Sequence, residues 1–84
     1  MVPAASGAYR LYREGAVILI GIALDLRAAL AEHREGRHAC TRGATAFGFE
    51  VSPDPVALQR KWLSEHARSN AGNLPECNGR RKPS

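Results

Sequence analysis

The strongest constraint on the fold is a short, continuous apolar run, Ala16–Gly21, that directly follows a turn signal. Such a run, rich in β-branched side chains, is typical of a strand buried on both faces. Gly15 precedes it, and glycine adopts the positive φ of a tight turn without steric cost. Before the turn, Tyr9 and Leu11 alternate with polar residues. The sequence therefore predicts that the domain opens with a β-hairpin.

A helix is predicted after the hairpin. Asp25 can accept hydrogen bonds from the free backbone N–H groups at the helix start, and Gly36 is a common residue at a helix end. An apolar stripe at positions i, i+3, i+4 and i+7 indicates the buried face. Its members are Leu26, Ala29, Leu30 and His33.

A third strand and a second helix follow. In the segment 44–51, Phe47, Phe49 and Val51 alternate with other residues, which is the period of a half-buried strand. Asp54 followed by proline predicts a helix start, and this helix should run to about Arg68. The five aromatic residues are expected to anchor the core, and residues 70–78 are predicted to be a loop. The aromatic residues are Tyr9, Tyr12, Phe47, Phe49 and Trp62.

Length and charge limit the organisation to one small domain. The 84 residues fit a single α/β domain, which we place at 7–78 after a flexible lead-in of residues 1–6. The net charge is +4, but a basic tail at 79–84 supplies three of these charges. The body is therefore nearly neutral, and a strong phosphate-binding surface is not implied.

The sequence predicts a cytoplasmic protein that does not enter a membrane. The longest apolar stretch, Ala16–Leu24, is far shorter than the roughly 20 residues that span a bilayer, and the N-terminus lacks the features of a signal peptide. The two cysteines, Cys40 and Cys77, are expected to be reduced thiols. Together with His33 and His38 they match no common zinc spacing, so no metal site is predicted.

Two tripeptides resemble those that name the GIY-YIG nucleases. They are Gly7-Ala8-Tyr9 on the first predicted strand and Leu19-Ile20-Gly21 on the second. Further matches follow in the family's order and spacing, so the resemblance covers nearly the whole chain. They are Asp25, Leu26, His33, Thr41, Arg42, Ala57, Leu58, Trp62, Leu63, Pro75 and Asn78. The resemblance implies a three-stranded antiparallel sheet flanked by helices, in the order hairpin, helix, strand, helix.

Active members of that family hydrolyse a phosphodiester bond with one divalent metal ion. The resemblance assigns the catalytic positions to Tyr9, His33, Gln59 and Asn78, and places the second tyrosine and the arginine at Leu19 and Ala29. Neither replacement can transfer a proton or carry charge, and Gln59 stands where a metal-binding glutamate is expected. A neutral amide is a poor sole ligand for magnesium. The catalytic set is therefore predicted to be vestigial, without a cofactor.

Helical phase decides whether a neighbouring arginine can replace the missing one. Arg27 precedes Ala29 by two residues, which is about 200° of helix rotation. Arg27 should therefore point away from the site that Ala29 faces. Gln59 should point inward, where Tyr9 or His33 could satisfy its amide.

Several arginines could contact a phosphate backbone, although glutamates are interleaved with them. We predict nucleic-acid contacts at Arg10, Arg27, Arg37 and Arg42, with Arg13 and Arg34 as further candidates. The predicted function is a non-cleaving module that binds nucleic acid weakly or binds a protein partner. The alternatives are a purely structural protein-binding module, and an active magnesium-dependent endonuclease whose missing groups come from Glu50 or a second copy.

Overall fold

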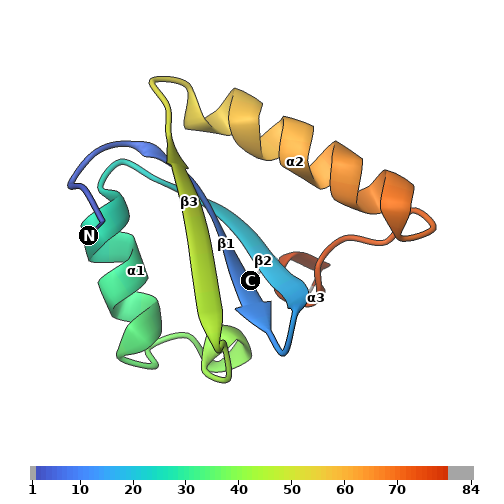
Figure 1. Ribbon diagram of the computed structural model, residues 1–84, viewed down its shortest axis with the longest axis horizontal. Coiled ribbons are helices and arrows are strands. Elements are labelled where there is room, and N and C mark those ends of the chain that lie inside the picture. Colours follow the sequence, from blue (N-terminus) through green and yellow to red (C-terminus); the bar gives the residue numbers. More distant parts are fainter. Residues whose placement is uncertain (1, 80–84) are drawn as a thin grey trace.

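The computed structural model describes residues 2–79, which form a small α/β domain (Figure 1). The predicted three-stranded antiparallel sheet flanked by helices is confirmed, in the predicted order. The elements are β1 (Gly7–Arg13), β2 (Ala16–Ala23), α1 (Leu26–Arg34), a 3-10 turn η1 (Ala39–Thr41), β3 (Ala46–Val51), α2 (Pro55–Ser69) and α3 (Glu76–Gly79). The short helix α3 lies at the end of the segment that was predicted to be a loop. Of the predicted basic tail, residues 80–84 lie outside the described part of the chain.

The local signals act as the sequence predicts. Glu14 and Gly15 both have positive φ, 50° and 87°, as the central residues of a type I′ hairpin turn require. Asp25 caps α1 by accepting a bond from the Ala28 N–H at 3.1 Å. Asp54 caps α2 in the same way, and Gly36 takes the left-handed conformation just beyond α1, with φ 77°.

The strand order is β2-β1-β3, with β1 pairing antiparallel to both neighbours. The apolar run is therefore an edge strand, yet both of its faces are covered. The register of the hairpin shifts between Leu11 and Tyr12, so that the partner strand has one extra residue there. As a result Ile18 and Leu19 both pack on the α1 side, whereas Ile20 packs on the other side.

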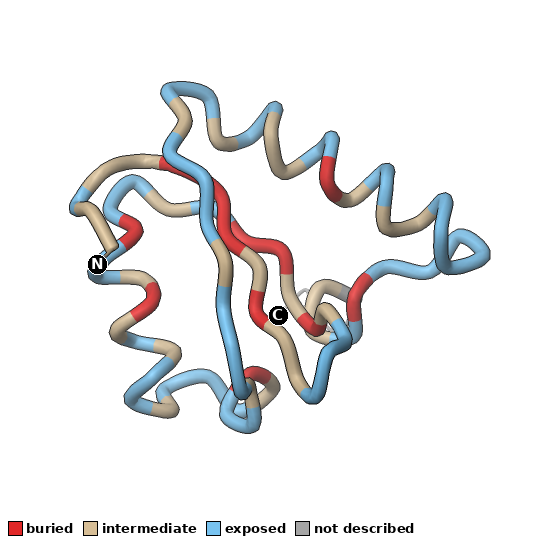
Figure 2. The backbone as a smooth tube through the Cα atoms, in the orientation of Figure 1, coloured by how far each residue is buried: buried red, intermediate tan, exposed pale blue. Residues whose placement is uncertain are grey.

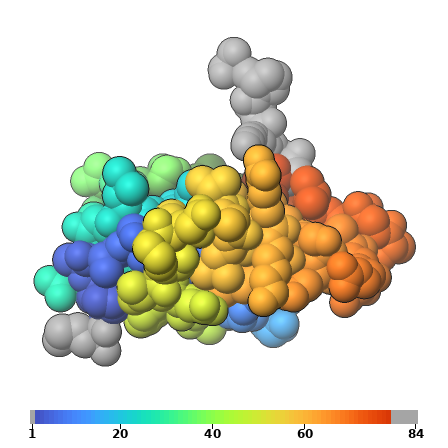
Figure 3. Space-filling view, turned by 90° about the horizontal axis from the view of Figure 1, so that it is seen from above, coloured from blue at the N-terminus to red at the C-terminus, as the bar shows by residue number. Residues whose placement is uncertain are grey.

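Two helices cover opposite faces of the hairpin. On one face, α1 buries Leu26 and Leu30 against Tyr9, in a core cluster that also includes Leu11 and Ile18. On the other, Trp62 of α2 packs against Ala8 and Ile20. Seen from above, α2 (yellow to orange) extends along its face of the molecule (Figure 3). Both helices lie over β1 and β2.

The expectation that Phe47 and Phe49 anchor the core is wrong. Their exposed fractions are 52% and 37%, and Val51 is 52% exposed. Figure 2 shows β3 exposed along nearly its whole length, whereas β1 and β2 contain buried residues. The alternation correctly identifies one apolar face of β3, but the helices lie over the other two strands.

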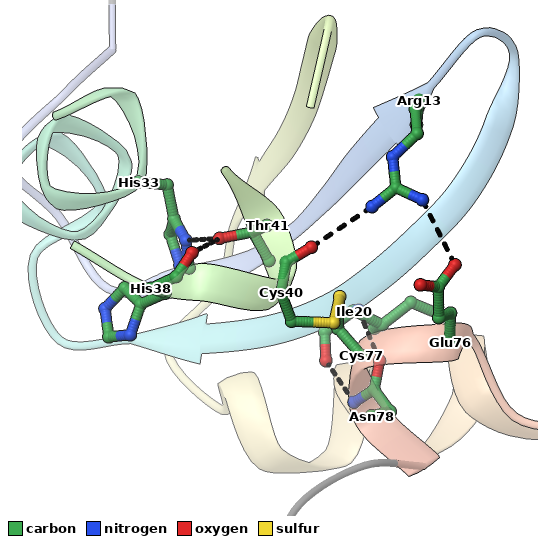
Figure 4. The surroundings of a disulfide bond; sticks show 9 residues. All are labelled: Arg13, Ile20, His33, His38, Cys40, Thr41, Glu76, Cys77 and Asn78. Atoms are coloured by element: carbon green, nitrogen blue, oxygen red, sulfur yellow. Dashed lines mark hydrogen bonds and ion pairs between the residues drawn. A yellow bond between two sulfur atoms is a disulfide. The ribbon is translucent and has the colours of Figure 1, made fainter. Parts of the chain in front are cut away.

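The expectation of two reduced thiols is also wrong, because Cys40 and Cys77 form a disulfide with a Cα–Cα distance of 5.7 Å. The 3-10 turn carries Cys40 to the end of the hairpin, and α3 carries Cys77 to the same place (Figure 4). Disulfides are typical of oxidising compartments. The cytoplasmic location therefore stays a prediction, without the support of reduced thiols.

The lead-in segment is tied to the domain at several points. Leu26 donates its backbone N–H to the Ala5 carbonyl at 2.9 Å, and the Ser6 hydroxyl donates to the Ser52 carbonyl at 2.7 Å.

Within residues 2–79, no helix has the length and apolar character needed to cross a membrane.

Candidate functional site

Tyr9, His33 and Thr41 form a chain of polar side chains beneath α1. The Tyr9 hydroxyl lies 3.0 Å from His33 Nε2, and His33 Nδ1 lies 2.7 Å from Thr41 Oγ1. The Thr41 hydroxyl donates to the His38 carbonyl at 3.3 Å. Every donor is satisfied when Tyr9 donates to Nε2 and neutral His33 donates from Nδ1 to Thr41. The chain is therefore complete without a substrate.

Burial makes this chain a poor proton-transfer device near neutral pH. Burial raises the pKa of Tyr9 above its ordinary value, and the charge of Glu32 raises it further. Burial also lowers the pKa of His33, with a further lowering by nearby His38 and an opposing effect of Glu32. Both groups are therefore held in their neutral forms, as a structural hydrogen-bond chain requires.

Gln59 and Asn78 meet on the outer edge of β2. Asn78 Oδ1 accepts from the Ile20 backbone N–H at 2.7 Å, and Asn78 Nδ2 donates to the Ile20 carbonyl at 2.9 Å. Gln59 Nε2 donates to the same carbonyl at 3.0 Å. The two amides thus occupy the hydrogen-bonding positions that a neighbouring strand would use.

The four predicted catalytic positions therefore divide into two pairs. Tyr9 and His33 lie together under α1, while Gln59 and Asn78 lie together at the β2 edge. The expectation that Tyr9 or His33 satisfies the Gln59 amide is wrong. The partner is a backbone carbonyl, which a side-chain pattern in the sequence does not identify.

The glycines of the two matched tripeptides have steric roles. The Tyr9 ring lies over Gly21, its cross-strand partner, and a Cβ there would come within 2.6 Å of the Tyr9 hydroxyl oxygen. A Cβ on Gly7 would collide with the Glu50 carbonyl and with Leu26. These glycines are explained by packing alone.

The helical-phase expectation agrees with the side-chain contacts. Ala29 and Leu19 pack against the core cluster that contains Tyr9. Arg27 instead donates from Nε to the Val2 carbonyl at 3.0 Å. The positions that the resemblance assigns to arginine and tyrosine therefore contribute only hydrocarbon to the neighbourhood of Tyr9.

A groove of about 810 Å³ lies between α1 and β3. Three arginines contribute to its lining, and its apolar wall includes Leu11 and Leu30; no carboxylate occurs among its described lining residues. Phe47 closes the groove on the β3 side, and its ring stacks with that of Phe49 at a centroid distance of 6.4 Å. The three arginines are Arg27, Arg34 and Arg42.

The predicted nucleic-acid contacts are only partly brought together. Arg27 and Arg42 line the groove, whereas the Arg10 guanidinium lies 3.8 Å from the centroid of the Trp62 ring on the other face. Arg37 forms an exposed ion pair with Glu35 at 3.0 Å. Arg34, named only as a further candidate, completes the groove.

The disulfide joins the segment next to the Tyr9–His33 pair to the segment next to the Gln59–Asn78 pair. Cys40 adjoins Thr41, and Cys77 adjoins Asn78 (Figure 4). The Arg13 guanidinium lies across the link, donating to the Cys40 carbonyl at 3.1 Å and to Glu76 Oε1 at 3.2 Å. The sequence gives no signal for this pairing, because the two cysteines are 37 positions apart and on irregular segments.

The residues present do not fit the magnesium ion that the resemblance implies. Magnesium prefers carboxylate oxygens, yet Gln59 offers only the oxygen of a neutral amide, whose Nε2 donates to the Ile20 carbonyl. Among residues 2–79, no group of three or more histidine, cysteine or acidic side chains is placed to hold a metal ion.

Comparisons with known families and curated proteins found no match to this chain.

Proposed function

We propose that the domain is a non-cleaving module that binds single-stranded nucleic acid in the α1–β3 groove. The observation that carries the proposal is the combination of three arginines, an absence of carboxylates in the described lining, and the adjacent exposed ring of Phe47. Proteins that bind single strands without sequence preference combine a basic groove with aromatic platforms. A phosphate backbone in the groove and a base on Phe47 would use both features.

The guanidinium groups are suited to phosphate. Arg27 and Arg42 are each held through Nε, to the carbonyls of Val2 and Gly36 respectively. The terminal nitrogens, which grip phosphate oxygens, take no part in these bonds. Loss of cleavage is part of the proposal, since hydrocarbon side chains at Leu19 and Ala29 stabilise no developing charge.

Salt-dependent binding of a fluorescent single-stranded oligonucleotide tests the proposal. Three phosphate contacts predict a slope of about −2 in log K against log salt, and each arginine-to-glutamine change in the groove should reduce its magnitude by about 0.7. Phe47→Ser should weaken binding roughly 5- to 100-fold through lost stacking. Arg37→Gln is the matched control, because Arg37 is exposed and lies outside the groove.

Three results would contradict the proposal. They are no binding at low salt, an equal loss of affinity in Arg37→Gln, and strand cleavage with added magnesium that Tyr9→Phe abolishes.

A further inference from the structure

We infer that β3 pairs with β3 of a second copy of this chain, giving a two-fold symmetric dimer with a continuous six-stranded sheet. This goes beyond the proposed function and does not depend on it. The outer edge of β3 faces the viewer in Figure 1 without a covering element among the described residues. An unpaired edge is a ready template for another strand.

Two hydrogen-bond patterns identify the backbone groups that point outward from β3. The Ser52 N–H donates to the Ser6 carbonyl at 2.9 Å, which places this pair at a bonded position of the ladder. Alternation then makes Arg10 and Gly48 a bonded pair. The opposite edge agrees, because Ile20 directs its N–H and carbonyl away from Arg10, toward Asn78. The free N–H and carbonyl groups of β3 therefore belong to the odd-numbered residues, Phe47, Phe49 and Val51.

A register centred on Phe49 satisfies all of these groups by symmetry. Phe49 would lie opposite Phe49 of the second copy, and Phe47 would lie opposite Val51. Each of these pairs is a bonded position, so the outward groups of both strands find partners. The three side chains lie on one face and are 37–52% exposed, so pairing places apolar surfaces of both copies side by side.

Charge is compatible with this register. Glu50 is the only charged residue of β3, and it would lie opposite Gly48 of the second copy rather than opposite another glutamate. The segment Ala46–Val51 contains none of the lysines or prolines that protect free edges, and its pairing with β1 has no bulge.

The other edge of the sheet explains why pairing closes at two copies. Asn78 and Gln59 already occupy the outer N–H and carbonyl of Ile20 on β2. Among the described residues, these bonds block strand pairing at the centre of the β2 edge, so a symmetric contact through β3 leaves no equivalent edge for a third copy. The result is a closed dimer rather than a filament.

In this register Gly48 of the second copy lies opposite Glu50, so the charge of a side chain introduced at position 48 tests the pairing. A Cβ on Gly48 would meet only the Tyr12 ring, at an ordinary distance of 3.9 Å, so side chains fit there in the monomer. Gly48→Lys would pair with Glu50 of the second copy twice by symmetry, whereas Gly48→Glu would oppose it twice. We expect dissociation constants about tenfold or more apart, with Gly48→Lys tighter than the parent.

Sedimentation equilibrium over about 10 µM to 1 mM measures this association. Ser64→Lys and Ser64→Glu are the matched controls, because Ser64 is exposed on α2 and the net charge changes equally. Gly48→Glu also lies beside Arg10 of its own chain, so the folded monomer should not be weakened by it. Association that follows this order, with no difference between the Ser64 variants, would support the dimer. If the protein stays monomeric at every concentration, or if Gly48→Lys and Gly48→Glu associate equally strongly, the proposed dimer is overturned.

Discussion

The two edges of the sheet differ in whether their outer backbone groups have hydrogen-bond partners. At β2, two side-chain amides bind the backbone of Ile20, and helices cover both faces of the strand. At β3, the outward backbone groups and an apolar face are exposed. Gln59 and Asn78 stand at the closed β2 edge, where their amides occupy the backbone positions that a neighbouring strand would use. The difference shows that one sheet can have an edge whose backbone is satisfied by side chains and an edge whose backbone is left free for another strand.

The largest expected effect concerns the disulfide that holds α3 against the closed edge. A loop of this size, closing 37 positions, stabilises a fold by about 4 kcal/mol through loss of unfolded-state entropy. The double variant Cys40→Ser, Cys77→Ser should lose about that much free energy of unfolding, measured with denaturant under oxidising conditions. Adding a reductant to this variant is the control and should change nothing. Equal stability of parent and variant would show that α3 is held by other contacts.

Truncating an apolar side chain should lower the free energy of unfolding more at the β2 edge than at the β3 edge. Ile20→Ala should cost about 3 kcal/mol, because Ile20 is only 1% exposed against Trp62. Val51→Ala should cost less than about 1 kcal/mol, because Val51 is 52% exposed. Denaturant unfolding in dilute solution measures both. Similar losses at the two positions would remove the distinction.

Removing the amide cap should have an intermediate effect. Asn78→Ala leaves the Ile20 N–H without its partner and should cost about 2 kcal/mol. Asn73→Ala is the control, because Asn73 is exposed and bonds only to a local carbonyl, so it should change stability by less than about 0.5 kcal/mol. Equal effects from the two asparagines would mean that the β2 edge does not need its cap.

The last prediction is a pH dependence of stability from the buried Tyr9–His33 pair under α1, and we expect its effect to be smaller than the others. The lowered pKa of His33 means that, below about pH 6.5, the unfolded chain takes up a proton that the folded chain resists, so stability should fall with acid. The raised pKa of Tyr9 means that the unfolded chain loses its proton first above about pH 10, so stability should also fall there.

Thermal unfolding across this range measures the pH effect. His33→Gln should flatten the acid limb, because it removes the imidazole whose pKa is lowered by burial. An acid limb that persists in His33→Gln would assign it to other groups.

The sequence predicts the elements well because their signals are local. Gly15, Asp25 and Asp54 act within a few residues of themselves, so the turn and both helix starts can be derived from short segments. The alternation in β3 reveals an apolar face, but nothing local states whether a helix will cover it. That depends on where both helices lie, which is a property of the assembled fold.

The candidate site shows the same limit. Helical phase correctly separates Arg27 from Ala29, since rotation per residue is fixed. The partner of Gln59 is a backbone carbonyl on another element, and the pairing of Cys40 with Cys77 joins two irregular segments. Neither follows from periodicity, because both depend on contacts between distant parts of the chain.

Amide hydrogen exchange at Ile20 and Phe49 tests the contrast between the edges most directly. The Ile20 amide should be protected at every protein concentration, because Asn78 accepts its bond. The Phe49 amide should exchange rapidly in dilute solution and become protected as the concentration rises. Strong protection of Phe49 in dilute solution, or rapid exchange at Ile20, would show that the two edges do not differ as described.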